Sequence, residues 1–283
     1  MEGITNLNYL IIIQPSKVQE FNILIMRRFI SLLLLLICFF FYYSGFSQSP
    51  KKSIYVIVHG AYGGGWGFKK VDSLLSDKKC IVYRPTLTGQ GERVHLASPD
   101  VGLSTHIKDI VNLILYEDLY NVILVGHSYG GMVITGVADS LPGRISKLIY
   151  IDALVPKDGE NVLQILGIST DKSKAEGIKK LVENGFIIPA WVSANKLPPK
   201  DVPHSLKTLT DTIVLKNAQR LKIPTTYILT VEKGKNVNDD DFASQADRAR
   251  KLNWPVLQLE ADHNPQWSAP EALVEMLKSI RDK

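Results

Sequence analysis

Cysteine is scarce in this chain: its 283 residues include only two, Cys38 and Cys80. Cys38 lies within an apolar run near the N-terminus, which leaves Cys80 as the one cysteine of the remaining chain. A single cysteine allows no internal disulfide, and this excludes a disulfide-stapled fold. Histidine and cysteine also do not recur at metal-ligand spacing, so we expect no metal and no organic cofactor.

The chain also lacks a concentration of positive charge. Its formal net charge is +5, but the lysines and arginines are scattered singly or in pairs, without interleaved aromatic residues. Nucleic-acid-binding domains gather basic residues into a stripe or a patch. We therefore expect a solvated basic surface and no nucleic-acid partner.

The apolar run near the N-terminus, residues 29–43, is short for a membrane span, which needs roughly 20 residues. It follows Met26-Arg27-Arg28 and precedes small residues. This order is typical of a secretory signal peptide. We predict that residues 26–47 form such a signal and that cleavage before Gln48 exports the protein to the periplasm or the medium.

Two alternatives concern the same region. An uncleaved signal would anchor the protein to the membrane, whereas cleavage predicts no stable membrane association. Residues 1–25 precede a good start at Met26, and we interpret them as a non-native N-terminal extension. Residues 48–283 then form the functional domain.

Apolar, β-branched runs alternate with amphipathic segments, such as 103–115 and 132–139, in this domain. Runs that are apolar throughout suit strands buried on both faces of a parallel sheet. The alternation predicts an α/β fold, with a mostly parallel central sheet flanked by helices. The expected strands are residues 53–58, 80–83, 121–125, 147–151, 225–229 and 255–259.

Residues 156–222 interrupt the alternation, because they contain several prolines and helix-like pieces but no clear strand. An irregular excursion of this length is uncommon in a compact domain. We predict a helical cap over one end of the sheet. After the last strand, Ser268 and Glu271 predict a capping box at the start of a terminal helix.

A glycine-flanked serine, Ser128, follows the third predicted strand in the segment NVILVGHSYGG. Gly126 and Gly130 complete the pattern G-x-S-x-G, and a helical segment follows. A serine at the apex of a sharp strand-to-helix turn needs glycines around it, because side chains there would collide. The turn exposes the hydroxyl, so we predict that Ser128 is a nucleophile.

A serine hydroxyl needs a base, and His263 is the candidate base. It follows the last predicted strand within EADHNP, and loops at the carboxyl edge of a parallel sheet are where sites form. His127 is adjacent to Ser128, so we expect its side chain to point elsewhere and pack beneath the turn. His59 ends the first strand, and we expect it to shape that loop.

Two backbone amides are candidates for an oxyanion hole. The turn geometry assigns one to Tyr129, and the glycine-rich loop after the first strand supplies the other at Ala61. Gly60 lets this loop approach a ligand closely. We expect Gly60, Trp66 and Trp191 to line the substrate pocket, although burial alone would also explain the tryptophans.

These motifs resemble the α/β-hydrolase fold family, and within it the esterases related to plant methylesterases and hydroxynitrile lyases, including bacterial esterases. The matching segments follow the family's order over most of residues 53–275. They are VIVHGAYGGGWGF, YRPTLTGQGERVHL, VGHSYGG, YIDALVPKDG and ADHNP.

The resemblance implies a catalytic triad in the order serine, acid, histidine. The acid usually follows the strand that here reads TTYILT, but no aspartate stands at that position; Glu232 lies near it. Asp152, which follows the preceding strand in YIDALVP, is the other candidate. We favour Asp152, because it is short and directly follows a strand, and keep Glu232 as the alternative.

The resemblance also implies a function. We expect a serine hydrolase that cleaves a small carboxylic ester through an acyl-enzyme intermediate. Asn264 stands where the related lyases have a lysine, which disfavours hydroxynitrile-lyase chemistry. Amide or lactone hydrolysis, and a non-catalytic ligand-binding role on the same scaffold, remain alternatives. The substrate and the oligomeric state are not predicted.

Overall fold

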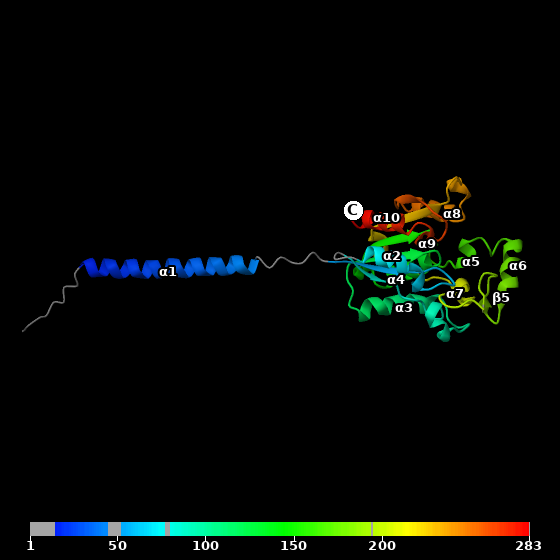
Figure 1. The fold of residues 1–283 in the computed structure, drawn as a ribbon, viewed down its shortest axis with the longest axis horizontal. Helices are drawn as coiled ribbons and strands as arrows, with labels where there is room; N and C mark the ends of the chain where they lie inside the picture. The colour runs from blue at the N-terminus through cyan, green and yellow to red at the C-terminus, as the bar shows by residue number, and fades with distance from the viewer. Residues whose placement is uncertain (1–14, 45–51, 77–79, 194, 283) are drawn as a thin grey trace, which may run out of the picture. The chain divides into compact units, whose positions relative to one another are not determined.

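A computed structural model describes residues 15–44, 52–76, 80–193 and 195–282 (Figure 1). The chain divides into two units, Met1–Lys51 and Lys52–Lys283. In the first unit, helix α1 extends from Pro15 to Ser44. None of the helices in the described part of the chain combines the length and hydropathy that crossing a bilayer demands. The predicted cleavage position before Gln48 lies outside the described residues.

A parallel six-stranded sheet forms the centre of the second unit, in the order β2-β1-β3-β4-β8-β9. The predicted strands are confirmed with ends that shift by up to two residues. Their apolar side chains leave the central strands buried on both faces, as the sequence pattern indicates. The bounds are β1 (Ser53–Val58), β2 (Cys80–Tyr83), β3 (Val122–His127), β4 (Ile145–Ile151), β8 (Thr225–Val231) and β9 (Val256–Glu260).

Helices cover both faces of the sheet, and alternate residues of each strand enter two separate cores. In β1, Val56 and Val58 pack with α3 (Leu103–Tyr116), α4 (Gly130–Ser140) and α8 (Ala243–Lys251). Tyr55 and Ile57 face the other way and pack with α2 (Lys69–Leu75) and α10 (Pro270–Arg281). Figure 1 shows α3 and α10 on opposite sides of the sheet. The predicted α/β fold is confirmed.

The segment between β4 and β8 contains the predicted cap, which Figure 1 shows at one end of this unit. The cap contains short helices, and a three-stranded antiparallel sheet that was not predicted also lies within it. Each of these strands has only two residues, too few to leave a periodic pattern in the sequence. The elements are α5 (Val162–Ile165), α6 (Lys172–Leu181), β5 (Val182–Glu183), β6 (Phe186–Ile187), β7 (His204–Ser205) and α7 (Lys207–Thr210).

The predicted capping box at the terminal helix is wrong. A short helix, α9 (Pro265–Ser268), precedes α10 and ends at Ser268. The Ser268 hydroxyl donates a hydrogen bond to Asp262 Oδ1 at 2.8 Å. α10 begins at Pro270, and Ala269 at its N-cap position provides no side-chain cap. Short 3-10 helices complete the fold: η1 (Gly65–Phe68), η2 (Gly91–Leu96), η3 (Pro142–Arg144), η4 (Ala218–Lys222) and η5 (Val237–Asp239).

Candidate active site

Ser128 lies at the turn from β3 to α4. Its φ angle is 54°, in the left-handed region that residues other than glycine seldom adopt. β3 ends at His127 and α4 begins at Gly130, so the chain reverses within two residues. The turn therefore has the sharpness that the glycine pattern predicts.

The two glycines of the motif are required by close backbone packing. A Cβ atom at Gly126 would lie 2.8 Å from the carbonyl oxygen of Gly130. A Cβ atom at Gly130 would lie 2.6 Å from the carbonyl oxygen of Val58 in β1. Any side chain at either position would push α4 away from the sheet and displace Ser128.

His263 contacts Ser128 from the loop that follows β9. The Ser128 hydroxyl lies 3.0 Å from His263 Nε2, within hydrogen-bond distance. On the other side of the ring, His263 Nδ1 lies 2.7 Å from Asp152 Oδ2. A carboxylate at Nδ1 holds the proton there and leaves Nε2 free to accept a proton from the serine.

Asp152, rather than Glu232, is the acidic side chain that contacts His263. Its side chain is 1% exposed, and its Oδ1 accepts a hydrogen bond from the Thr230 backbone N–H at 3.2 Å. Glu232 instead forms an ion pair with Lys235 at the surface. The structure therefore brings together Ser128, His263 and Asp152 and leaves Glu232 outside the site.

Two contacts of His263 were not predicted from the sequence. The buried His127 ring donates a hydrogen bond from Nε2 to the His263 carbonyl oxygen at 2.7 Å. Burial lowers the pKa of His127 to about 3, so this ring is neutral. The Phe242 ring stacks on the His263 imidazole, with centroids 4.6 Å apart and an interplanar angle of 14°. In the sequence, the only indication that His127 supports His263 is its place directly before Ser128.

The loop after β1 passes directly against the turn. A Cβ atom at Gly60 would lie 3.0 Å from the Ser128 Cβ atom, which explains the glycine. The backbone N–H groups of Ala61 and Tyr129 donate no hydrogen bond to any other residue that the structure describes. Tyr129 directly follows Ser128 in the chain, and Ala61 follows Gly60 in the loop packed against it, so both amides remain candidates for an oxyanion hole.

His59 holds this loop in place, as its position predicts. Its Nδ1 donates to the Gly60 carbonyl oxygen at 2.7 Å, and its Nε2 accepts from the Leu87 backbone N–H at 3.1 Å. Burial lowers the pKa of His59 to about 4, so both bonds are those of a neutral ring.

A cavity of about 550 Å³ opens beside Ser128 and His263. The predicted pocket residues Gly60, Trp66 and Trp191 all line it. Its volume lies within the range of small-molecule sites. In the part of the chain that the structure describes, no three histidine, cysteine or acidic side chains gather as they would around a metal ion.

Aromatic pairs form much of the cavity wall. Trp66 stacks on Trp267, with ring centroids 5.8 Å apart and an interplanar angle of 23°. Trp191, which is 64% exposed, meets Tyr62 edge to face at 5.7 Å. Trp267 and Tyr62 were not singled out from the sequence. The walls suit a flat, apolar group next to the serine.

A family model described as the alpha/beta hydrolase family matches residues 55–276. The match covers the whole sheet from the third residue of β1 onward, together with Ser128, Asp152 and His263. The chain belongs to the alpha/beta hydrolase family. The family resemblance of the sequence motifs is thereby confirmed.

Known proteins similar to this alpha/beta hydrolase include two curated relatives. It is 48% identical over 112 residues to a carbendazim hydrolyzing esterase of Nocardioides sp. (strain SG-4G), which covers 40% of this chain and 46% of that protein. It is 25% identical over 272 residues to methylesterase 3 of Arabidopsis thaliana, which covers 84% of this chain and 99% of that protein. The chain thus spans about half the length of the Nocardioides relative, and 56% of a chloroplastic Arabidopsis relative.

A solved structure, described as an extracellular alpha/beta-hydrolase from a Paenibacillus species, has the same fold as this alpha/beta hydrolase. The TM-score is 0.66 at 20% sequence identity, and the alignment covers 81% of this chain and 98% of that one. At this identity the likeness concerns the fold alone.

Proposed function

We propose that this alpha/beta hydrolase is a serine esterase that cleaves small carboxylic esters through an acyl-enzyme intermediate. The observation that carries the proposal is a continuous hydrogen-bonded chain from Ser128 through His263 to Asp152, with distances of 3.0 and 2.7 Å. Such a chain converts a weak alcohol nucleophile into a reactive one.

In the first step, Ser128 Oγ attacks the ester carbonyl carbon while His263 Nε2 takes the hydroxyl proton. The imidazolium that forms lies against the buried Asp152 carboxylate, which stabilises its charge. Burial keeps the neighbouring His127 neutral, with its pKa lowered to about 3. No second positive charge then opposes protonation of His263.

The carbonyl oxygen becomes negatively charged in this step. The free amides of Ala61 and Tyr129 donate to it, and each donor accelerates acylation by roughly 10²–10³. When the tetrahedral intermediate collapses, the ester C–O bond breaks and His263 returns its proton to the leaving alcohol. Water, deprotonated by His263, then cleaves the acyl-enzyme and regenerates the Ser128 hydroxyl.

The cavity supports a small substrate with a flat apolar part. Its volume of about 550 Å³ and its aromatic walls suit a substituted ring or a short acyl chain. Relatives named as an esterase and a methylesterase support ester hydrolysis as the reaction.

Turnover of p-nitrophenyl acetate tests the proposal. We expect the Ser128→Ala variant to lose at least about 10³-fold in kcat/KM, because removal of the nucleophile abolishes acylation. Ser140→Ala, at the other end of α4, is the control and should hydrolyse the ester at the unmodified rate. Equal turnover by the Ser128→Ala variant, or no turnover of a panel of esters by the intact protein, would instead favour a binding protein.

A further inference from the structure

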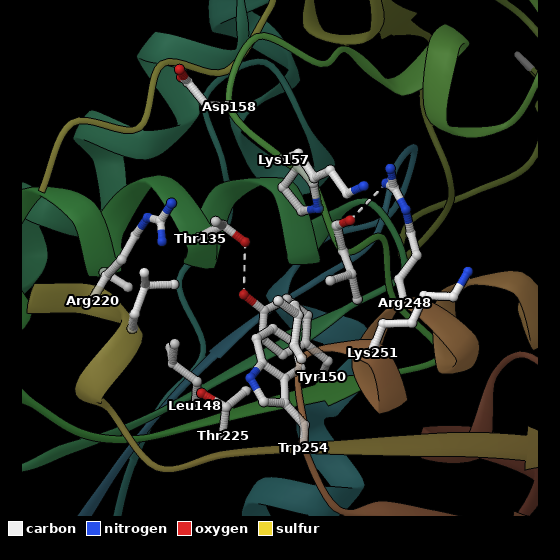
Figure 2. A pocket seen from close by; sticks show the side chains of 15 residues that line it. Thr135, Leu148, Tyr150, Lys157, Asp158, Arg220, Thr225, Arg248, Lys251 and Trp254 are labelled. Carbon is white, nitrogen blue, oxygen red and sulfur yellow. Dashed lines mark hydrogen bonds between the residues drawn. The ribbon is translucent and has the colours of Figure 1, made fainter. Parts of the chain in front are cut away.

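A second cavity, of about 410 Å³, lies on the sheet face that α4 and α8 cover. Its lining includes Leu148 and Tyr150 of β4, Thr225 of β8 and Trp254 (Figure 2). It shares no lining residue with the cavity beside Ser128. Its volume is also in the range of small-molecule sites.

This cavity lies where the chain returns from the cap to β8 without a long helix to cover the sheet. Between Asp211 and Pro224, all of which the structure describes, the only helical element is the short η4, which contacts α4. In a sheet with helices on both faces, a longer helix would fill this position. The side chains of β4 and β8 therefore border open space between α4 and α8.

The floor of this cavity is aromatic. The Tyr150 ring stacks on the Trp254 ring, with centroids 5.1 Å apart and an interplanar angle of 27°. The Tyr150 hydroxyl is hydrogen-bonded to Thr135 Oγ1 at 2.7 Å, which Figure 2 shows as a dashed line. That polar end is satisfied within the protein and Tyr150 is buried, so the half-buried Trp254 ring is the one that presents an apolar surface to a ligand.

Cationic side chains surround the aromatic floor. Figure 2 shows Arg220 on one side of the rings and Lys157, Arg248 and Lys251 on the other. Asp158 is the single acidic residue of the lining, and its Oδ1 already accepts the Leu215 backbone N–H at 2.7 Å. The field inside the cavity therefore favours a negatively charged ligand.

The four cations differ in how far they are neutralised. Arg248 binds Glu160 and the Val155 carbonyl oxygen, and Lys157 lies within Coulombic range of the same glutamate. Lys251 forms no ion pair or hydrogen bond with any other residue of the described chain through its side chain. The Lys251 ammonium at the rim is therefore free to bind an incoming anion, as is the Lys157 ammonium, which also lacks an ion pair among the described residues.

Arg220, on the other side of the rings, is already ion-paired. Its Nε lies 3.3 Å from Asp139 Oδ1, but this buried nitrogen has no hydrogen-bond partner among the described residues. Asp139 is occupied by the backbone amides of Lys216 and Asn217. The Arg220 charge is therefore balanced by Asp139 and its Nε is buried, so the cations left to a ligand are the lysines of the lining.

We propose that this cavity is a second ligand site that binds a small aromatic carboxylate. The ligand's ring lies against Trp254, which is itself stacked on the buried Tyr150, and its carboxylate faces the cationic rim at Lys251. Stacking and burial of the ring supply the apolar contribution, and the charge excludes neutral and cationic analogues. The site is independent of the chemistry proposed for Ser128.

Calorimetric titration of the full chain with sodium 2-naphthoate tests this site. The neutral analogue 2-naphthalenemethanol has the same ring system and should bind at least about tenfold more weakly, because it lacks the charge. Lys251→Glu reverses the charge at the rim and should weaken naphthoate binding by about tenfold or more.

Lys180→Glu is the matched control, because Lys180 is an exposed lysine in the last turn of another helix, α6. It should leave the affinity for naphthoate unchanged within about twofold. Trp254→Leu tests the aromatic floor separately and should weaken binding severalfold while thermal unfolding stays cooperative.

Four results would overturn the proposal. They are no binding at millimolar naphthoate, equal binding of the neutral alcohol, equal weakening in the Lys251→Glu and Lys180→Glu variants, and unchanged binding in both the Lys251→Glu and Trp254→Leu variants. The last result would mean that naphthoate binds in the cavity beside Ser128 instead. None of these readouts depends on ester turnover.

Discussion

Ser128 and Asp152 combine a chemically active side chain with a left-handed backbone. Their φ angles are 54° and 43°, and each residue directly follows a strand. Backbone hydrogen bonds hold both in this conformation, from Ser128 N–H to Ile151 at 3.2 Å and from Asp152 N–H to Ile228 at 2.8 Å. Strained residues of this kind cost about 1–3 kcal/mol each and concentrate at functional sites. Here the strain turns both side chains out of the sheet toward His263.

The Asp152→Asn substitution should reduce kcat for ester hydrolysis by roughly 10²–10⁴. The amide no longer fixes the tautomer of His263 and no longer stabilises the positive charge of its imidazolium form. Glu232→Gln, which removes an exposed charge outside the site, is the control and should retain full activity. The pH–rate profiles of both variants measure the effect. A loss confined to Glu232→Gln would reassign the acid.

His127 should act as a positioning residue for His263. His127→Phe removes the Nε2–H donor to the His263 carbonyl oxygen and should lower kcat about tenfold with little change in KM, because the loop then holds the base less well. His127→Gln retains an N–H donor and should recover part of the rate. An unimpaired His127→Phe variant, which keeps an aromatic ring but loses the donor, would show that the hydrogen bond does not position His263.

In the turn between β3 and α4, backbone segments pack more closely than side chains at Gly126 and Gly130 would allow. α4 starts directly above the end of β1, so a side chain on its first residue would collide with the Val58 carbonyl oxygen. This closeness also brings the loop after β1 against Ser128. One packing contact between an element end and a neighbouring strand thus sets the position of the nucleophile and of the candidate oxyanion amides.

Two glycine-to-alanine changes test this element. Gly130→Ala should destabilise the fold by about 2–4 kcal/mol, because the new Cβ meets a backbone oxygen that cannot move freely. Gly177→Ala, in helix α6 with open space around it, should stabilise by up to about 1 kcal/mol. Urea unfolding measures both. Equal effects of the two substitutions would contradict the role assigned to close packing.

Four histidines from separate parts of the molecule are buried and have lowered pKa values. Burial lowers the pKa of His59 to about 4 and of His127 to about 3. It also lowers the pKa values of His106 and His204. They come from four separate segments, and each would gain a proton in the unfolded chain near its ordinary pKa of about 6.5. The folded protein therefore binds fewer protons than the unfolded chain when the pH falls below about 6.5.

Stability should consequently fall as the pH decreases. The contribution of these rings is fully present above about pH 7 and is lost progressively as the pH falls below about 6.5 toward their folded pKa values. We expect the free energy of unfolding to drop by at least about 2 kcal/mol between pH 7 and pH 5. Urea titrations at several pH values measure it. The His127→Phe variant should show a shallower decline, and a flat profile for the intact protein would refute the account.

Local patterns in the sequence were sufficient for the sheet and for part of the site. Continuous apolar runs predicted the strands because strands buried on both faces need them throughout. The glycines around Ser128 and the loop position of His263 predicted a pair that the structure brings to 3.0 Å. The apolar strands, the turn at Ser128 and the loop that carries His263 each depend on neighbouring residues in the chain. A single stretch of sequence was therefore enough to predict each of them.

Only the tertiary structure decided between the two acidic candidates. Asp152 and Glu232 follow β4 and β8, which are neighbours in the sheet, so sequence position alone leaves both within reach of the histidine. Asp152 is engaged by Thr230 and His263, whereas Glu232 turns to Lys235. The stacking of Phe242, the support from His127 and the second cavity likewise arise between segments distant in sequence. They depend on how elements pack together, which no single segment encodes.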